Sequence, residues 1–160
     1  MKKLLRAFLW ITFAIYALVL IKLLFLNRAP FGDRNILHHI NLVPFKTLHG
    51  YVEMIANNRI NFDVAIKNLV GNLILFFPMG ILLPCLFSWV RGWKRFLLVM
   101  LGMLLAVELL QLMLLVGTFD VDDLLLNLIG AVCGFALLYL PFLNWCLRRI
   151  SFLSDKASWS

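Results

Sequence analysis

The residues of this sequence that could do chemistry are a small group of acidic side chains in its C-terminal half. Glu108 and Gln111 are three residues apart, so on a helix they share one face. Asp120, Asp122 and Asp123 follow in a stretch, residues 117–123, that has no basic residue. Grouped carboxyl groups can act as general acid and base or hold a divalent cation. The four carboxylates are therefore the candidate catalytic residues.

Three asparagines extend this polar set onto neighbouring helical stretches. Asn68 and Asn72 are four residues apart, and Asn127 lies four residues after Asp123, so each pair shares a helical face. Where helices pack in an apolar environment, amide side chains are as often links between helices as ligands. We treat Asn68, Asn72, Asn127 and Gln111 as candidate binding residues, with helix linkage as the alternative.

The acidic positions also have a structural explanation. Asp120 is a good N-cap for a helix that starts at Val121, and carboxylates in the first turn favour the positive end of the helix dipole. Three carboxylates in four positions nevertheless repel one another, and a cation, a basic headgroup or a basic side chain would relieve the repulsion. Glu108 could likewise hydrogen-bond Asn72 or Asn127 merely to fix the helix packing. For these residues, both a functional and a purely structural role stay open.

The composition defines the solvent in which these residues work. Of 160 residues, 63% are hydrophobic and 14% charged, whereas soluble domains have roughly 45–50% apolar and about 25% charged residues. This excludes a soluble enzyme, a disordered tail and a disulfide scaffold. It predicts an all-α, polytopic membrane protein. The net charge of +7 sorts by loop, as described below, so we expect no nucleic-acid partner.

Four stretches are long and apolar enough for transmembrane helices, which need about 20 residues each. They cover about residues 4–26, 64–90, 96–116 and 121–143. The second contains Pro78, Gly80 and Pro84, and we expect that helix to be bent or broken there. Gly130 and Gly134 in the fourth are spaced for close helix packing.

The basic residues predict the orientation, because short basic segments stay on the cytoplasmic side. The N-terminus carries Lys2, Lys3 and Arg6, the 91–95 loop has three basic residues, and the tail is also basic. We therefore expect both termini and the 91–95 loop in the cytoplasm, and residues 27–63 and 117–123 outside. The acidic and amide side chains then all lie toward the outer leaflet.

The chain is expected to form one domain with four parts. Residues 1–26 are an anchor helix, 27–63 an extracytoplasmic segment, 64–143 a three-helix core and 144–160 a cytoplasmic tail. Within the extracytoplasmic segment, Leu48, Val52, Ile55 and Arg59 fall at helical spacing. They predict a short amphipathic helix over about residues 45–58.

The histidines and the known catalytic motifs add no further site. His38 and His39 are adjacent and cannot both face one metal from a regular element, and His49 is the remaining imidazole. With no zinc-type ligand spacing, contact with the surface or with lipid headgroups is the expected role. No catalytic triad, P-loop or dinucleotide turn is present. We therefore predict no metal and no cofactor.

Four motifs occur in a fixed order along the chain. They are Asn41-Leu-Val-Pro44-Phe45 with Lys46-Thr47, the stretch from Asn68 through Gly71-Asn72 to Pro78 and Gly80, Glu108-Leu-Leu-Gln111, and Phe119-Asp120-Val-Asp122-Asp123 running to Asn127 and Gly130. Together they resemble the VanZ-like family of bacterial membrane proteins, which is named for a teicoplanin-resistance protein. The resemblance covers about residues 41–140.

The resemblance implies a multi-pass protein of the bacterial cytoplasmic membrane. Some members are linked to reduced susceptibility to glycopeptide antibiotics that act outside the membrane, and the family has no established chemistry. It adds Asn41 and Pro44 to the candidate binding residues. Many members have an arginine directly before the Phe-Asp step, where this chain has Thr118, so the pattern does not by itself imply resistance here.

Three functions are compatible with the sequence. The preferred one is an outer-leaflet polar pocket that is covered by residues 27–63 and binds a lipid or glycolipid headgroup. Its partners would be membrane lipids, a lipid-linked envelope precursor or a glycopeptide. The pocket would be formed by Glu108, Gln111, Asp120, Asp123, Asn72 and Asn127.

The rival is a membrane enzyme that acts on a lipid-linked substrate through paired carboxylates or a bound divalent cation. Proton-coupled transport through Glu108 is weaker, because the cytoplasmic halves of the helices offer no second ionisable group.

Overall fold

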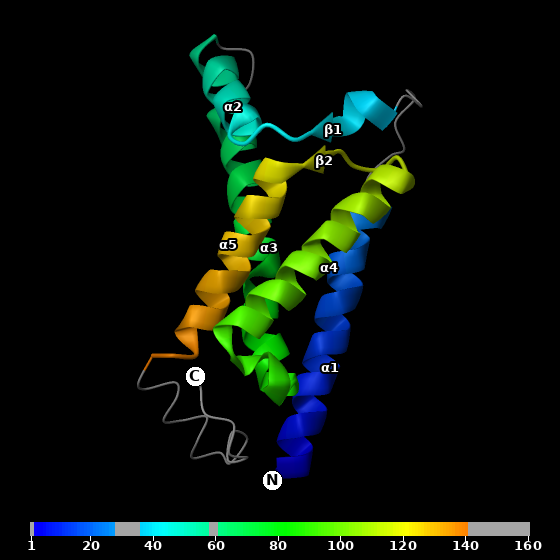
Figure 1. Cartoon of the computed structure of the whole chain (residues 1–160), viewed down its shortest axis with the longest axis vertical. Coiled ribbons are helices and arrows are strands. Elements are labelled where there is room, and N and C mark those ends of the chain that lie inside the picture. Colours follow the sequence, from blue (N-terminus) through cyan, green and yellow to red (C-terminus); the bar gives the residue numbers. More distant parts are fainter. Residues whose placement is uncertain (1, 28–35, 58–60, 141–160) are drawn as a thin grey trace.

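The computed structural model describes residues 2–27, 36–57 and 61–140, and these are mostly helical (Figure 1). The long helices are α1 (Lys2–Ile21), α3 (Phe62–Leu86), α4 (Trp93–Met113) and α5 (Val121–Leu137). The shorter elements are the π-helix η1 (Lys22–Leu26), the 3-10 helices η2 (Ile36–His39) and η3 (Ser88–Arg91), helix α2 (Lys46–Ala56), and strands β1 (Ile40–Asn41) and β2 (Phe119–Asp120).

Three helical stretches among the described residues are long and apolar enough to cross a membrane: Lys3–Leu26, Ala65–Leu86 and Trp93–Met113. They correspond to the first three predicted spans. Helix α5 has 17 residues, which is about 25 Å at 1.5 Å per residue, short of a bilayer core of about 30 Å. The predicted fourth span, 121–143, continues past residue 140 and so lies partly outside the described residues. It stays a prediction.

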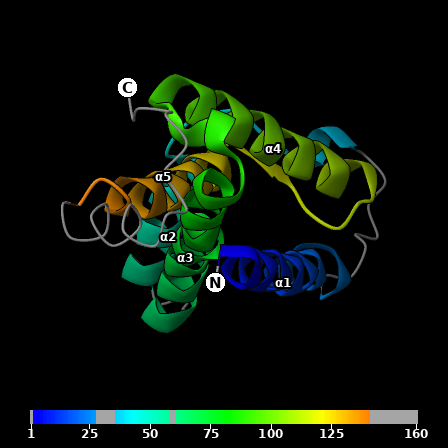
Figure 2. The ribbon, with the colours of Figure 1, turned by 90° about the horizontal axis from the view of Figure 1, so that it is seen from below.

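Helices α3 and α5 form the spine of the bundle. In Figure 2, α3 occupies the centre, with α5 and α1 beside it and α4 next to α5. A Cβ atom at Gly130 would lie 1.9 Å from the carbonyl oxygen of Leu73, and one at Gly80 would lie 2.0 Å from that of Ala131. The two helices therefore pack backbone against backbone. This confirms the packing role predicted for Gly130 and Gly134.

Helix α3 is continuous, although Pro78 and Pro84 lie inside it. The chain is therefore not broken at these prolines, and the other expected outcome, a bend, stays a prediction. Proline removes one hydrogen-bond donor and frees a carbonyl one turn earlier, but neighbouring helices can hold such a helix together. Here the close contact of α3 with α5 does so, and packing overrides the local rule.

The apolar core lies between α3, α4 and α5. Phe76, Phe96 and Phe135 are fully buried there. The rings of Phe96 and Phe135 stack at 4.0 Å, and Trp93 packs edge-on against Phe135 at 4.7 Å. Aromatic contacts of this kind add about 0.5–1.5 kcal/mol to the burial itself.

Helix α1 is attached by a few specific contacts along a mostly exposed surface. The hydroxyl of Tyr16 donates to the carbonyl oxygen of Leu75 at 2.7 Å. At the far end, Nε2 of Gln111 donates to the carbonyl oxygen of Leu24, inside η1, at 3.0 Å. A π-helix leaves main-chain groups misaligned with the α pattern and recurs at functional positions. Gln111 therefore ties α4 to α1.

Strands β1 and β2, helix α2 and the first turns of α3 and α5 lie at one end of the bundle (Figure 1). We call this the polar end. Strands β1 and β2 pair in parallel, with Ile40 opposite Phe119 and Asn41 opposite Asp120. Helix α2 lies where a helix over 45–58 was predicted, and its amphipathic character stays a prediction. The strand pair brings the first loop onto the start of α5.

Candidate functional site

Asp122 holds the start of α2 in place from another helix. Its side chain is 1% exposed. One carboxylate oxygen accepts the backbone N–H of Phe45, and the other accepts those of Thr47 at 2.9 Å and Leu48 at 3.3 Å. Phe45 has a left-handed backbone with φ of 65°, which turns the chain so that these N–H groups converge. Asp122 thus caps a helix whose own preceding residue provides no side-chain cap.

Asp120 connects β1 and the start of α2 to the start of α5. Its Oδ1 accepts Nδ2 of Asn41 at 3.1 Å and the backbone N–H of Asp122 at 2.9 Å. Its Oδ2 accepts the hydroxyl of Thr47. Asp120 is therefore the N-cap of α5, as predicted, and is also an anchor for residues 41–47. Three donors occupy a buried carboxylate.

Asp123 and Asn72 link α5 to α3. Nδ2 of Asn72 donates to Oδ1 of Asp123. The alternative foreseen for Asn72, a link between helices, is therefore present, and its partner is Asp123. The three clustered aspartates therefore have three different structural roles. Hydrogen-bond donors on neighbouring segments offset the repulsion between their charges.

Glu108, Gln111 and Asn127 are buried inside the bundle. Gln111 makes the contact with η1 given above. Asn127 is 4% exposed, and its Oδ1 has no hydrogen-bond partner within the described part of the chain. A buried amide oxygen without a donor costs about 1–3 kcal/mol. None of the three side chains lines the pocket described next.

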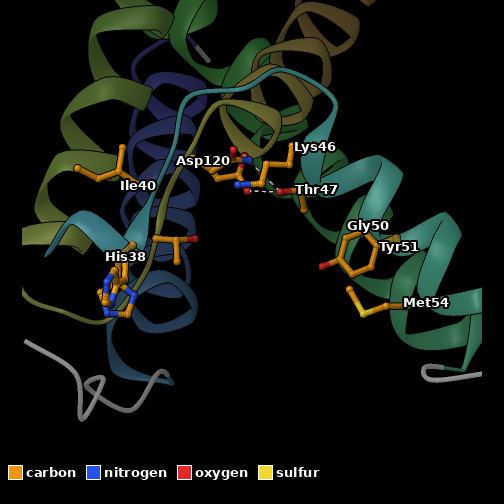
Figure 3. Close-up of a pocket in the computed structure, with 11 residues that line it drawn as sticks. His38, Ile40, Lys46, Thr47, Gly50, Tyr51, Met54 and Asp120 are labelled. Carbon is orange, nitrogen blue, oxygen red and sulfur yellow. Dashed lines mark hydrogen bonds between the residues drawn. The ribbon is translucent and has the colours of Figure 1, made fainter. Parts of the chain in front are cut away.

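A pocket of about 400 Å³ opens at the polar end (Figure 3). Its lining residues are His38, His39, Ile40, Asn41, Lys46, Thr47, Gly50, Tyr51, Met54, Thr118 and Asp120. Figure 3 shows Asp120, Thr47 and Lys46 grouped together, with Tyr51 and Met54 on the α2 side and His38 on the opposite side. The pocket therefore combines a polar floor with apolar walls from Ile40 and Met54.

Tyr51 brings a phenol to the α2 side of this pocket. Burial raises the pKa of Tyr51 above its usual value of 10.0, a hydrogen bond from Asn68 lowers it, and the charges of Asp123 and Asp120 raise it further. The net pKa is raised, so the hydroxyl keeps its proton at neutral pH and can donate it to a ligand. Asn68, the hydrogen-bond partner of this phenol, is exposed.

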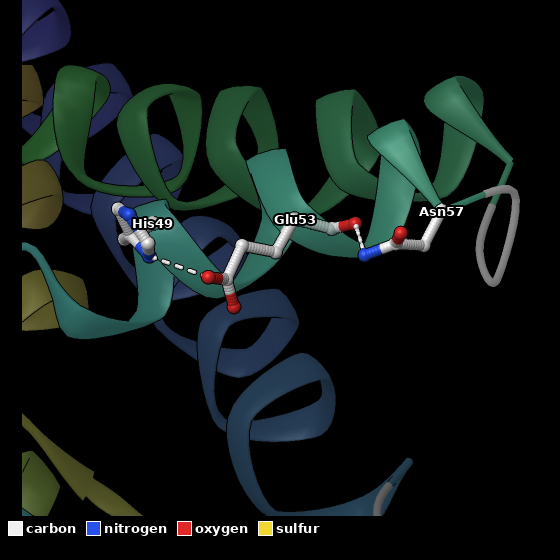
Figure 4. A network of polar contacts seen from close by, with 3 residues as sticks. All are labelled: His49, Glu53 and Asn57. Atoms are coloured by element: carbon white, nitrogen blue, oxygen red, sulfur yellow. Dashed lines mark hydrogen bonds and ion pairs between the residues drawn. The ribbon is translucent and has the colours of Figure 1, made fainter.

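The opposite side of α2 carries an exposed polar row (Figure 4). Nδ1 of His49 lies 3.6 Å from Oε1 of Glu53, and Nδ2 of Asn57 donates to the carbonyl oxygen of Glu53 at 2.9 Å. The His49 side chain is 73% exposed. An ion pair so exposed contributes little stability. Across the described ranges, no group of three or more His, Cys, Asp or Glu is placed to hold a metal.

The pocket differs from the one predicted. Of the six side chains expected to form it, Asp120 lines it, and the segment expected to cover it supplies most of its wall. Asn41 also lines the pocket, whereas the neighbouring Pro44 is exposed outside it. Sequence reasoning missed Lys46, Tyr51 and Thr118. The signal that was available is that Gly50, Tyr51 and Met54 are spaced to lie on one side of the predicted helix. The helix was predicted from its apolar positions, and this side was not considered.

Comparison with protein families gives one clear match. The family model described as VanZ/LLP1 matches residues 13–144, which include every helix and strand of the polar end. Comparisons with curated proteins and with solved structures gave no match. The matched region also contains most of the helical stretches apolar enough to cross a membrane. Because the match covers most of its 160 residues, this membrane protein belongs to the VanZ/LLP1 family.

Proposed function

We propose that this VanZ-family protein is a binding protein of the cell envelope, and that its pocket holds a lipid or glycolipid headgroup at the outer face of the bacterial cytoplasmic membrane. In this proposal four helices span the membrane and both termini are cytoplasmic. The observation that carries it is the pocket at the polar end, which has polar and apolar walls side by side.

The size and chemistry of the pocket support a headgroup ligand. A volume of about 400 Å³ lies within the range of roughly 300–1,000 Å³ found for small-molecule sites. Lys46, Tyr51 and Thr118 supply hydrogen-bonding groups, and Ile40 and Met54 add apolar surface on opposite sides of the pocket. A lipid headgroup together with the adjoining part of its acyl chains offers both kinds of surface.

The hydrogen bonds of the aspartates favour binding over catalysis. A general base needs a lone pair directed at the substrate. Asp120 and Asp122 each accept three hydrogen bonds from neighbouring groups, so most of the lone pairs of each carboxylate are already engaged. They are suited to hold the pocket wall rather than to transfer protons. The binding hypothesis therefore has more support than the enzyme hypothesis.

Envelope lipids link this pocket to antibiotics that act outside the membrane. A headgroup held at the outer leaflet changes how envelope lipids and lipid-linked precursors are displayed there. We expect this to be the route by which the protein reduces susceptibility to glycopeptides such as teicoplanin. In that case pocket occupancy and susceptibility change together.

Gly50 allows a direct test, because it lines the pocket from inside α2 and a Cβ atom there would have only Met54 nearby, at 3.8 Å. Gly50→Phe fills the pocket and replaces a poor helix former, so the fold is retained. We expect lipid that co-purifies with the protein, counted by native mass spectrometry, to fall at least about tenfold, since tenfold is only 1.4 kcal/mol. Teicoplanin susceptibility of the expressing cells should return to that of cells without the protein.

The matched control is Val52→Phe, because Val52 lies on the same helix, is 64% exposed and does not line the pocket. It should leave both readouts at the wild-type level. A Gly50→Phe protein that inserts normally and keeps its full complement of lipid would overturn the proposal.

A further inference from the structure

We infer that the pocket selects an anionic headgroup that bears a phosphate, in preference to an uncharged sugar or an amine. The inference rests on the proposed function, because it names the class of ligand for that same pocket. The carrying observation is an imbalance between hydrogen-bond donors and acceptors among the lining side chains.

The acceptor groups of the pocket are already in use. Asp120 takes hydrogen bonds from Asn41, Thr47 and the backbone of Asp122. The hydroxyl of Thr47 also accepts Nδ2 of Asn41 at 3.1 Å, and Oδ1 of Asn41 accepts the backbone N–H of Val43 at 3.3 Å. Little lone-pair capacity is left for a ligand that brings donors. An ammonium headgroup would find most of the acceptor positions of Asp120 already taken.

The donor groups of the pocket are still available. Lys46 has an ammonium with three N–H donors and no acceptor. It is exposed, and it has no ion-pair partner in residues 2–27, 36–57 or 61–140. The phenol of Tyr51 accepts from Asn68 and keeps its own proton. Thr118 adds a hydroxyl from the opposite segment.

A phosphate matches this set of donors. It offers several acceptor oxygens and a negative charge, and hydrogen bonds between charged groups are about twice as strong as neutral ones. An uncharged sugar would use the hydroxyl groups but would gain nothing from the charge of Lys46.

The same chemistry could come from a phospholipid or from free phosphate. The apolar surface that Ile40 and Met54 add to the pocket favours a headgroup that carries its acyl chains with it. The experiment separates the two sources.

The test compares two lipids that differ in the phosphate, phosphatidylglycerol and glucosyl-diacylglycerol, added to the full-length protein in one detergent and counted by native mass spectrometry. We expect phosphatidylglycerol to bind about tenfold more tightly. Lys46→Gln should weaken phosphatidylglycerol about five- to tenfold and leave glucosyl-diacylglycerol unchanged. The matched control is Lys67→Gln, an equal charge change at an exposed residue of α3 outside the pocket, which should alter neither.

Added inorganic phosphate identifies the source. Displacement of phosphatidylglycerol by millimolar phosphate supports a site for phosphate from either source, and no displacement supports a lipid headgroup that needs its acyl chains. Equal binding of the two lipids to the wild type, or equal losses of both in Lys46→Gln, would overturn the phosphate inference and leave the pocket itself standing. Retention of both lipids by Gly50→Phe would instead overturn the proposed function.

Discussion

The two ends of the bundle both bury a charged residue, but they satisfy it in different ways. At the polar end, Asp122 accepts N–H groups from residues 74–77 positions earlier in the chain. At the opposite end, Arg91 is 4% exposed and its Nε donates to the carbonyl oxygen of Pro84, seven residues away, at 3.1 Å. Tyr139 donates its hydroxyl to the carbonyl oxygen of Arg91 at 3.3 Å.

The difference explains why we place the ligand at one end. Arg91 is held by a carbonyl group seven residues away, so this contact only closes the turn between α3 and α4. Asp122 is held by a distant loop, so this contact keeps the loop over the helix ends. The pocket is the space between that loop and the helices. Trp10, Trp89 and Trp93 are exposed near the Arg91 end, a distribution typical of a membrane interface. In our proposal the Arg91 end anchors the protein in the membrane and the polar end binds the ligand.

The largest expected effect comes from breaking the polar end at Asp122. In Asp122→Ala, three backbone N–H groups lose their acceptor, at about 1–3 kcal/mol each when buried. Because these groups are partly exposed, we expect a loss of about 3–4 kcal/mol in the free energy of unfolding, together with loss of bound lipid. Denaturation in detergent and native mass spectrometry measure the two effects.

Asp63→Ala is the control for that change, since Asp63 is an exposed carboxylate in the first turn of α3. Its effect should stay within about 0.5 kcal/mol. If Asp122→Ala were as stable as Asp63→Ala, the role of Asp122 as a clamp would be wrong.

A change at the opposite end should be smaller and should sharpen the comparison. Arg91→Ala leaves the carbonyl oxygen of Pro84 without its donor and removes a buried side chain, so we expect a loss of about 2 kcal/mol in stability. Lipid binding at the polar end should not change, because distant sites act independently. Arg95→Ala, at an exposed arginine of α4, is the control. Reduced lipid binding in Arg91→Ala would show that the two ends are coupled.

The smallest effect is expected at Tyr51. Tyr51→Phe removes one donor from the pocket and should weaken lipid binding roughly two- to threefold, with stability at neutral pH unchanged. The raised pKa of this phenol also predicts a pH effect. A raised pKa in the folded state gives stability that is fully present below pH 10 and is lost as the pH rises through the folded-state value.

Denaturation between pH 9 and 11.5 checks this, with the loss at high pH smaller in Tyr51→Phe than in the wild type. Identical pH profiles for the two proteins would contradict a buried, protonated phenol at this position.

The parts of the fold set by local pattern could be predicted from the sequence. Apolar runs located α1, α3 and α4, the acidic start of α5 predicted Asp120 as its cap, and spaced glycines predicted that α5 packs closely against another helix, without identifying α3. The prolines of α3 left both a bend and a break open, because tertiary packing decides whether a helix continues past them.

The pocket could not be predicted in the same way. Asp122 acts on residues about 75 positions away, and no spacing in the sequence records that contact. Strands β1 and β2 have two residues each, which is too short for any periodicity. In the sequence, Lys46 and Tyr51 look like ordinary polar residues of a surface helix, and only the strand pair brings Thr118 and Asp120 to the same pocket.

The clamp at Asp122 has a consequence for biogenesis. Phe45 and Thr47 precede Asp122 by 77 and 75 residues. Because ribosomes add about 5–20 residues per second, these two residues are made roughly 4–15 s before the carboxylate that accepts their N–H groups. During that interval the first loop and the helices before it can be in place, while the start of α2 is still uncapped. A nascent chain that stops before Asp120 would insert α1, α3 and α4 and yet have no ligand pocket. Under the proposed function, the protein therefore becomes able to bind its ligand only when the start of α5 has been synthesised.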